Sequence, residues 1–290
     1  MTTRDGNGWT MCGKGHRHWG LHGAAGLLAY ATGGPGAPSV LLQRRSEWSH
    51  HGGTWGLPGG AMDSHESVID AALREAAEEC GIPAYAVTVT GILRDDHGSW
   101  SYRTVISSAP EPFAVHAASA ETIEVAWVAA GDVDRLALHP GFASQWPVLR
   151  EALQPLTIIV DAANVMGSRP DGWWRDRAGA ASRLRGELAE LAVRGLDALP
   201  ELLAVPALEL WFPDYALVVE GAARRMAAEA PPAGRVRVVA AAGSGDDAIA
   251  ALAGELRGWR LVVTADRELR GRCRSAGASV TGPGWLLGLL

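Results

Sequence analysis

The sequence predicts an α/β protein of two domains, with residues 1–154 in the first and residues 155–290 in the second. In the first part, an amphipathic helix with a glutamate-rich face lies between predicted strands. In the second part, short apolar runs alternate with amphipathic segments, which favours a parallel sheet covered by helices on both faces. A proline-punctuated segment, residues 138–155, separates the two patterns. We therefore place the boundary near Pro155.

Strands are predicted on both sides of the glutamate-rich helix. Residues 39–45, SVLLQRR, are expected to form a strand, and residues 54–60, TWGLPGG, the end of a strand and a loop. Residues 122–136, TIEVAWVAAGDVDRL, predict a later strand and the start of a helix. The helix therefore follows a glycine-containing loop at the end of a strand.

The helix itself is predicted within residues 59–82, GGAMDSHESVIDAALREAAEECGI. Asp63 and Glu66 have the spacing of a capping box, which places the helix start just after the glycine pair of this segment. Gly81 and Pro83 predict its end, because glycine adopts the left-handed cap conformation and proline cannot continue a helix. The residues expected to pack inward recur at three- and four-residue spacings: Val68, Ile69, Ala72, Leu73 and Ala76.

Three glutamates of this helix share one face. Glu75, Glu78 and Glu79 stand at positions i, i+3 and i+4, so their carboxylates converge and repel one another. A hard divalent cation such as Mg2+ or Mn2+ would remove the conflict, because it takes oxygen ligands and often bridges carboxylates to the phosphates of a substrate. The spacing therefore predicts a metal site.

The whole segment resembles the Nudix box in the following pattern: Gly60, five residues, Glu66, seven residues, Arg74-Glu75-Ala76, one residue, Glu78-Glu79, one residue, Gly81-Ile82. Ala76 departs from the family pattern, which more often has a larger aliphatic residue there. The alternative is an ordinary surface helix with ion pairs such as Asp70 with Arg74.

This resemblance implies an α/β/α sandwich with a mixed sheet. It also implies a Mg2+- or Mn2+-dependent pyrophosphohydrolase that cleaves a nucleoside di- or triphosphate derivative by water attack on phosphorus. The implied metal ligands are the Gly60 carbonyl, Glu75, Glu78 and Glu79, and the implied catalytic residues are these three glutamates and Arg74. Arg74 would orient Glu75, and Glu75 or a loop acid would help to activate water. Glu121 and Glu124 are either that loop acid or plain surface charges.

The candidate substrate contacts of the first domain precede the helix, and they are Arg44, Arg45, His51 and Trp55. His50 or His51 could contact phosphate, and Trp48 or Trp55 could stack on a base. Ordinary packing explains the tryptophans equally well.

Composition limits the class of protein and its location. The net charge is -6 at pH 7, and neither half is strongly basic, so bulk electrostatics do not demand nucleic-acid binding, although a local basic groove stays open. The three cysteines lie far apart, which argues against a disulfide framework. Neither a membrane span nor a signal peptide is evident. We therefore expect a cytoplasmic protein without membrane partners.

The second domain is expected to alternate strands and helices. The strands are predicted at residues 156–161, 215–221, 235–241, 260–266 and 278–280. The helices are predicted at residues 177–193, 221–230, 245–258 and 266–276. In sheets of this type, sites lie at the carboxyl ends of the strands.

Acidic residues occupy those strand ends. Asp161, Glu220 and Asp266 end predicted strands, and Asp246 and Asp247 open a helix. Acids from separate strand ends can converge on a pair of divalent cations, as a two-metal nuclease requires. Alternatively, Asp246 and Asp266 could be helix caps.

Four segments of the second domain resemble the NYN branch of PIN-like domains, particularly its YacP-like kind: VDAANVMGSRPDGWW (160–174), VVEGAAR (218–224), GSGDDAI (243–249) and VTADREL (263–269). The resemblance implies a Rossmann-like parallel fold and a metal-dependent ribonuclease. The implied metal ligands are Asp161, Asp246, Asp247 and Asp266, with Asn164 as a substrate contact. Glu220 stands where aspartate is more usual in that family, and Asn164 could instead be a turn residue.

The Nudix activity on a nucleotide is expected to be primary, with the NYN half as a second metal site. The alternative is an RNA-processing endoribonuclease whose second domain is the main catalyst, or a second domain that only binds RNA or nucleotide. Residues 169–177, RPDGWWRDR, could stack bases and hold phosphates, or form a packed loop.

A cysteine and two histidines lie close together near the N-terminus. A tetrahedral zinc ion bound by Cys12, His16 and His18 would require a fourth ligand, and the sequence contains no Cys-x-x-Cys motif that could supply it. The segment is therefore expected to be a strand or loop without metal.

Overall fold

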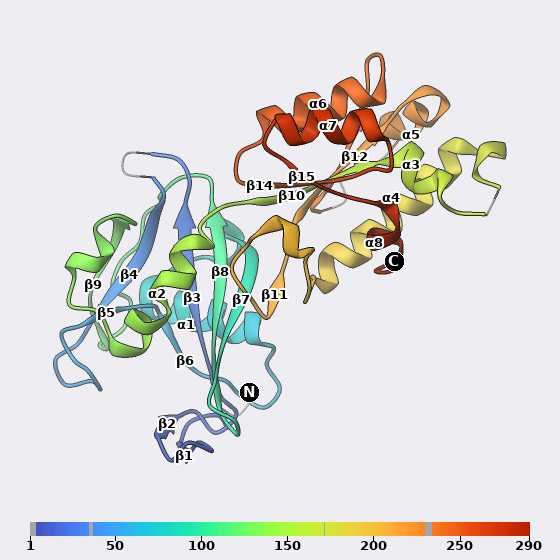
Figure 1. Cartoon of the computed structure of the whole chain (residues 1–290). Coiled ribbons are helices and arrows are strands. Elements are labelled where there is room, and N and C mark those ends of the chain that lie inside the picture. The colour runs from blue at the N-terminus through green and yellow to red at the C-terminus, as the bar shows by residue number, and fades with distance from the viewer. Residues whose placement is uncertain (1–3, 35–36, 171, 230–233) are drawn as a thin grey trace. The chain divides into compact units, whose positions relative to one another are not determined.

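A computed structural model describes residues 4–34, 37–170, 172–229 and 234–290 (Figure 1). The chain divides into two compact units. The N-terminal unit comprises Met1–Leu153 with Pro206–Glu209, and the C-terminal unit comprises Gln154–Val205 with Leu210–Leu290. Asp171 of the arginine- and tryptophan-containing segment, and Ala230 at the end of a predicted helix, lie outside the described residues.

The N-terminal unit is built on a mixed sheet. Its strands are β1 (Trp9–Met11), β2 (Arg17–Trp19), β3 (Ala24–Ala31), β4 (Ser39–Arg45), β5 (Trp55–Gly56), β6 (Gly59–Ala61), β7 (Thr88–Asp96), β8 (Ser101–Ala109) and β9 (Thr122–Ala129). The order is β7-β8-β3-β4-β5, with β6 also on β3 and β9 also on β4, while β1 and β2 form a separate ribbon. Only the β3–β8 pair of this unit's described strands is parallel. The predictions of a mixed sheet and of strands at residues 39–45 and from residue 122 are confirmed.

Strand β3 fixes the glycine loop to the centre of the sheet. Every residue of β3 is buried. The short strand β6 pairs with it antiparallel, with Gly59 opposite Gly26 and Gly60 opposite Ala25. A side chain at Gly59 would meet the backbone of β3, since a Cβ atom there would lie 2.5 Å from the Ala25 carbonyl oxygen. Glycine therefore lets the loop lie flat against the central strand.

Helix α1 (Val68–Cys80) begins later than the capping-box spacing predicts. Ser67 is its N-cap, and the Ser67 hydroxyl accepts a hydrogen bond of 3.1 Å from the Asp70 amide. The predicted start just after Gly60 is wrong because the residues between β6 and Ser67 form a loop, in which the Glu66 carboxylate accepts from the Asp63 amide. The predicted end is confirmed, since Gly81 has φ +66° and the left-handed conformation. Ala72 and Ala76 of the predicted stripe are fully buried.

The proline-punctuated segment before the boundary contains a helix that the sequence analysis did not predict. Helix α2 (Pro140–Glu151) begins with Pro140 in its first turn and buries Phe142, Trp146 and Leu149. These residues recur at four- and three-residue spacings, which is the helical pattern. Two short 3-10 turns, Ala84–Ala86 and Val133–Arg135, complete the named helical elements of this unit.

The C-terminal unit contains a fully parallel sheet, as predicted. The strands of this sheet are β10 (Leu156–Asp161), β12 (Asp214–Val219), β13 (Val236–Ala240), β14 (Trp259–Val263) and β15 (Ser279–Thr281), while the two-residue strand β11 (Leu210–Trp211) lies outside it. The sheet order is β13-β12-β10-β14-β15, and every pair is parallel. All six residues of the central strand β10 are buried, as expected for a sheet covered on both faces.

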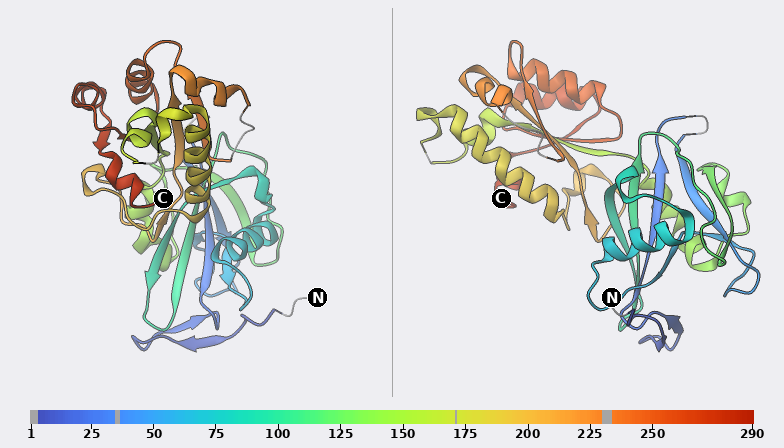
Figure 2. Two further views of the ribbon diagram at one scale, coloured as in Figure 1. Left: turned by 90° about the vertical axis from the view of Figure 1, so that its right-hand side faces the viewer. Right: turned by 180° about the vertical axis from the view of Figure 1, so that it is seen from behind.

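Helices lie on both faces of this sheet (Figure 1 and Figure 2). They are α3 (Ala162–Gly167), α4 (Arg177–Arg194), α5 (Arg224–Glu229), α6 (Gly245–Glu255), α7 (Arg267–Ser275) and α8 (Pro283–Leu287). Helices α6 and α7 share an apolar core with one face of the sheet, which includes Ile159, Ile249 and Leu269. The helix predicted at residues 221–230 is divided into a 3-10 turn, Gly221–Ala223, and α5.

Helices α3 and α8 were not predicted, because both are short. Among the described residues, we find no helix with the length and apolar character that crossing a bilayer requires.

Two substitutions test which face of α2 packs against the rest of the N-terminal unit. Leu149 is fully buried, and Leu149→Ala is expected to lower the free energy of unfolding by about 2–5 kcal/mol, because it leaves a cavity. Val148→Ala changes an exposed neighbour in the same helix and should cost less than about 1 kcal/mol. Urea unfolding measures both, and equal effects would contradict the assigned orientation of α2.

Candidate active site

The close approach of Glu75 to Gly60 defines the centre of the candidate site in the N-terminal unit. A Cβ atom at Gly60 would lie 2.6 Å from Glu75 Oε1 and 2.8 Å from Oε2. Only glycine therefore allows the Glu75 carboxylate of α1 to lie against the β6 backbone. The predicted proximity of these two residues is present in the structure.

Arg74 holds the loop and the helix in one arrangement. Its Nε and Nη2 atoms donate to the two Glu66 carboxylate oxygens at 2.6 and 2.8 Å, while Nη1 donates to Glu75 Oε1 at 2.6 Å. Nη2 also donates to the Ala61 carbonyl at 3.0 Å. The hydrogen bond from Arg74 lowers the pKa of Glu66, and the bond to Glu66 raises the pKa of Arg74. Both groups are therefore charged at neutral pH.

Glu79 is the most deeply buried of the three glutamates, with 6% of its surface exposed. Its Oε2 atom accepts from the Gly59 amide at 2.8 Å and from Gln43 Nε2 at 2.8 Å. Burial nevertheless raises the pKa of Glu79 to about 7, and the nearby Glu75 contributes to the rise. Burial also raises the pKa of Glu75, although Arg74 opposes this effect.

Glu78 completes the group at the exposed edge of the helix. Its carboxylate contacts Arg4, and Arg74 Nη1 lies 3.6 Å from its second oxygen. The charge on Glu78 also raises the pKa of Glu75. Glu75 thus lies within electrostatic range of both Glu78 and Glu79, and the three carboxylates carry more negative charge than Arg74 alone can balance.

Gln43 is a site residue that the sequence analysis missed. Its Nε2 donates to Glu79, while its Oε1 accepts from Thr122 Oγ1 at 2.5 Å. Gln43 is buried at 1% exposure in a strand whose other buried positions are Ser39 and aliphatic residues. A buried amide in such a strand is the signal that could have identified it.

Three of the predicted substrate contacts of this unit, Arg44, Arg45 and Trp55, lie on β4 and β5, and the fourth, His51, lies in the turn between these strands. Arg44 stands opposite Trp55 in the sheet register, and its guanidinium lies 3.5 Å from the Glu47 carboxylate. Arg45 donates to the His50 carbonyl at 3.2 Å, and its charge lowers the pKa of Glu79. The β4–β9 register shifts between Arg44 and Arg45, and Arg45 is the arginine whose charge acts on Glu79.

Three histidines cluster beside these strands. Their ligand-type atoms, from His50, His51 and His139, lie within 4.8 Å of one another. Burial, followed by the charge of Arg45, lowers the pKa of His139 to about 4. His139 also caps α2, because its Nδ1 atom accepts from the Gly141 amide at 3.2 Å.

The remaining candidates of this unit are exposed. Trp48 is 69% exposed. Glu121 and Glu124 are also exposed, and Glu124 stands opposite Arg44 in the β4–β9 register. The structure leaves their role open between a loop acid and surface charge.

Asp161 is a buried acid of the C-terminal unit that accepts three hydrogen bonds. It lies at the carboxyl end of β10 with 5% exposure, and its Oδ1 accepts from the Asn164 amide at 3.0 Å to cap α3. Its Oδ2 accepts from Asn164 Nδ2 at 2.6 Å and from Thr264 Oγ1 at 2.8 Å. Asn164 is therefore a partner of the acid and not simply a turn residue.

The other strand-end acids gather near Asp246. Burial raises the pKa of Asp246, and the charges of Asp161, Asp266 and Glu220 add to the rise. Asp266 caps α7 through a 2.7 Å bond from the Leu269 amide, which confirms the capping alternative for that residue. Ser244, not Asp246, caps α6, so the same alternative is wrong for Asp246.

Two acids of this unit are engaged elsewhere. The Asp247 carboxylate accepts from Arg272 at 2.7 Å and is largely exposed, and Glu220 accepts from the Gly245 amide at 2.7 Å. Asp161, Asp266 and Glu220 therefore lie within electrostatic range of Asp246, whereas the Asp247 carboxylate is paired with Arg272.

Comparison with known proteins identifies the family. Residues 20–152 match the model of the NUDIX domain. A Mycobacterium tuberculosis protein named "Putative 8-oxo-dGTP diphosphatase 3" is 46% identical over 160 residues, which cover 53% of this chain and 72% of that protein. A Bifidobacterium longum protein named "Nucleoside triphosphate pyrophosphatase/Nudix hydrolase fusion protein" is 39% identical over 156 residues, covering 52% of this chain and 32% of that protein.

Among solved structures, a Nudix hydrolase from M. Smegmatis, RenU, is 47% identical with a TM-score of 0.47, and the match covers 51% of this chain and 94% of that chain. The identity to the Mycobacterium tuberculosis protein and the match to the NUDIX domain model together show that this chain belongs to the Nudix family. It is a Nudix hydrolase.

The lowered pKa of His139 predicts a pH dependence of stability. The unfolded chain binds a proton at His139 near pH 6.5, whereas the folded state excludes it until about pH 4, so stability is lost as pH falls through this window. His139→Asn keeps a capping acceptor but does not titrate. The wild type is expected to lose about 1 kcal/mol more than His139→Asn between pH 7.5 and 5, since partial exposure screens the effect. Urea unfolding at both pH values measures this, and equal losses would refute it.

Proposed function

We propose that this Nudix hydrolase is a Mg2+-dependent, or Mn2+-dependent, pyrophosphohydrolase that cleaves a nucleoside di- or triphosphate derivative. The observation that carries the proposal is the Glu75 carboxylate against the Gly60 backbone, with Glu78 and Glu79 within electrostatic range of it. Like charges so close together, two of them with raised pKa values, favour binding of a cation. We also propose that residues 1–154 form the Nudix domain.

The residues of the cluster fit a hard divalent cation. Carboxylate and carbonyl oxygens suit Mg2+ and Mn2+, and the cluster offers them without a thiol or imidazole among its members. Gly60 keeps a side chain out of the space beside the Glu75 carboxylate. The residues that would hold the cation are Glu75, Glu78, Glu79 and the Gly60 carbonyl.

The chain's own residues would then prepare the reaction. The bound cation would supply charge neutralisation of the phosphates and a water molecule of lowered pKa. Arg74 orients Glu75 and, through Glu66, fixes the loop that carries Gly60. Because burial raises the pKa of Glu75, this carboxylate is suited to take a proton from the attacking water. Gln43 and the Gly59 amide prevent Glu79 from rotating.

The substrate class follows from the strands beside the cluster and from the relatives. Two relatives carry names that refer to nucleoside triphosphates, 8-oxo-dGTP in one of them. Arg45 and His51 are proposed to bind phosphate oxygens, with Arg44 and Trp55 at the adjacent strand edge. An arginine beside the carboxylates complements the negative charge of a polyphosphate.

A charge-neutral substitution tests the metal site. Glu78→Gln keeps the size of an exposed side chain, and it is expected to lower kcat/KM with Mg2+ by about 100-fold or more, because a charged ligand is lost. A panel of nucleoside triphosphates, oxidised nucleotides and dinucleotide or sugar diphosphates provides the substrates. Asp70→Asn removes the same charge from the same helix and should retain activity. Full activity of Glu78→Gln, or no turnover of the whole panel by the wild type, would refute the proposal.

We further propose that residues 155–290 form a Rossmann-like NYN domain with a metal-dependent ribonuclease site. The support is the gathering of Asp161, Asp246, Asp266 and Glu220 at the carboxyl ends of parallel strands. Such ends are the usual location of sites in open α/β sheets. Asn164 and Thr264 hold Asp161 in a fixed orientation. The proposed RNA contacts are Asn164 and the segment around Trp173 and Trp174.

Cleavage of a labelled RNA panel with Mg2+ or Mn2+ tests this second activity. Asp246→Asn and Asp161→Asn are each expected to lower the cleavage rate by at least about 100-fold, because each removes a charged ligand. Glu268→Gln changes an exposed acid close to Asp266 and should cut like the wild type. If the wild type binds the RNA without cutting it, the second domain is an RNA-binding domain and not a ribonuclease. If the wild type neither cuts nor binds any RNA of the panel, the ribonuclease and the RNA-binding roles are both rejected.

A further inference from the structure

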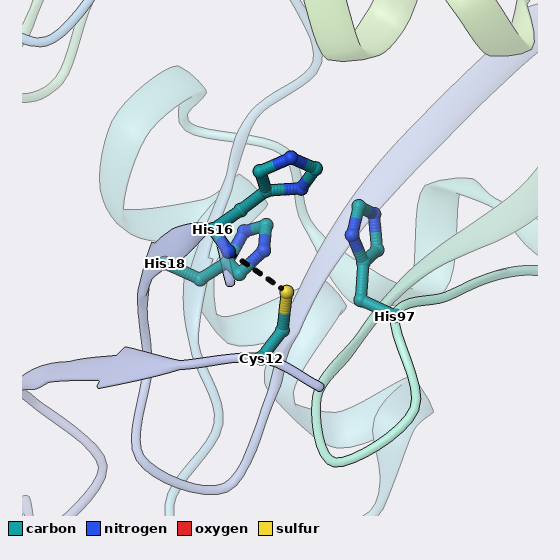
Figure 3. A group of neighbouring side chains, drawn as sticks. All are labelled: Cys12, His16, His18 and His97. Atoms are coloured by element: carbon teal, nitrogen blue, oxygen red, sulfur yellow. Dashed lines mark hydrogen bonds between the residues drawn. The ribbon is translucent and has the colours of Figure 1, made fainter. Parts of the chain in front are cut away.

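We infer that Cys12, His16, His18 and His97 form a zinc site in the N-terminal unit. Each residue offers one ligand atom, and the four atoms lie within 4.8 Å of one another. Figure 3 shows these side chains converging from two segments, the β1–β2 ribbon and the turn between β7 and β8. This site is independent of the proposed Mg2+ site, because none of its ligands belongs to the Nudix motif.

The spacing suits a tetrahedral zinc ion. Zinc bonds of about 2.0–2.1 Å to nitrogen and about 2.3 Å to sulfur place neighbouring ligand atoms about 3.3–3.7 Å apart. The four atoms therefore need to move inward by only about 1 Å, which side-chain rotation can supply. One thiolate and three imidazoles suit zinc, whereas Mg2+ prefers oxygen ligands.

Two unpartnered nitrogens supply a second observation. His18 Nε2 and His97 Nδ1 are buried and have no hydrogen-bond partner among the described residues. Buried polar atoms are almost always paired, since an unmade hydrogen bond costs free energy. Both residues belong to the cluster, so one cation bound at these two nitrogens would satisfy both.

The surroundings orient the ligands as in known metal sites. The far nitrogen of His97, Nε2, lies 3.3 Å from Asp95 Oδ2, and a carboxylate at that position fixes the ring and leaves Nδ1 for a metal. The His18 ring stacks on Trp100 with 4.0 Å between ring centroids.

The backbone also prearranges the site. The His16 amide donates to Cys12 Sγ at 3.4 Å, and the Cys12 amide donates to the His16 carbonyl at 2.9 Å, which closes the turn between β1 and β2. The Gly13 amide donates to the His97 carbonyl at 3.2 Å and so joins the two turns. Four protein ligands leave no open position, so the zinc would be structural.

A structural zinc would fasten the β1–β2 ribbon to the β7–β8 hairpin. The chain before β1 also contacts the loop that enters α1, since the Gly6 amide donates to Asp63 Oδ1 at 2.8 Å and Arg4 contacts Glu78. Zinc would therefore stabilise the segment that covers one side of the Nudix loop.

Metal analysis of the full chain, purified without a histidine tag, tests the inference. The wild type is expected to hold one zinc per chain and to bind added Zn2+ at least about 100-fold more tightly than Cys12→Ser or His97→Asn, measured by chelator competition. Asp95→Asn should weaken binding by about 10- to 100-fold, because only the orientation of His97 is lost. His116→Asn, which changes an exposed histidine outside the cluster, should bind like the wild type.

Cobalt substitution gives an independent readout. Co2+ in the wild type should show the strong visible absorption of a tetrahedral site and a thiolate charge-transfer band that Cys12→Ser lacks. If a variant does not fold, measurements on the wild type alone test the inference. A chelator should remove the zinc and lower Tm, and added Zn2+ should restore both the zinc content and Tm. A wild type that retains no zinc in chelator-free buffer and does not bind added Zn2+ more tightly than Cys12→Ser would overturn the inference.

Discussion

The N-terminal site depends on the hydrogen bonds of Arg74. A planar guanidinium can donate to several acceptors in fixed directions, and here it joins Glu66, Glu75 and the Ala61 carbonyl. These partners come from the loop, the helix and the short strand before the loop, so one side chain fixes three elements. A lysine has the same charge but cannot pair with a carboxylate in this two-pronged way.

The cost of the site is concentrated at Glu79. A carboxylate buried to this degree is destabilising unless it is paired, and its pKa of about 7 expresses that cost. Gln43 offsets part of it, and Gln43 is in turn held by Thr122 on β9. A network that joins α1, β4 and β9 thus holds one carboxylate oxygen in place, and the remaining unfavourable charge is what binding of a cation would relieve.

The acids of the C-terminal unit have a double role in the geometry. Asp161 ends β10 and Asp266 follows the end of β14 by three residues, and each caps the next helix, so one carboxylate oxygen of each is engaged in the fold. Parallel strands bring their carboxyl ends to the same edge, and the capped helices begin there. The capping role and a ligand role are therefore compatible for Asp161, whose second oxygen is oriented by Asn164 and Thr264.

The sequence by itself determined the features that depend on neighbours along the chain. The helix carrying Glu75, Glu78 and Glu79, its glycine end, the strands of the parallel sheet and the acids at their ends follow from local spacing, because helical and strand periods are fixed by backbone geometry. Helix α2 also has the helical spacing of buried residues, but it was not predicted because its prolines, Pro140 and Pro147, are typical of a segment between domains.

Only the tertiary structure decided which distant residues meet. Gln43 reaches Glu79 because β4 lies next to β3 and α1 packs on β3, and His97 joins Cys12 because the β7–β8 turn lies against the β1–β2 turn. Glu66 pairs with Arg74 from the loop before α1, and the helix begins at Val68 after its N-cap Ser67. Such contacts depend on strand order and loop path, which are set by the packing of the whole unit and not by the local pattern of residues.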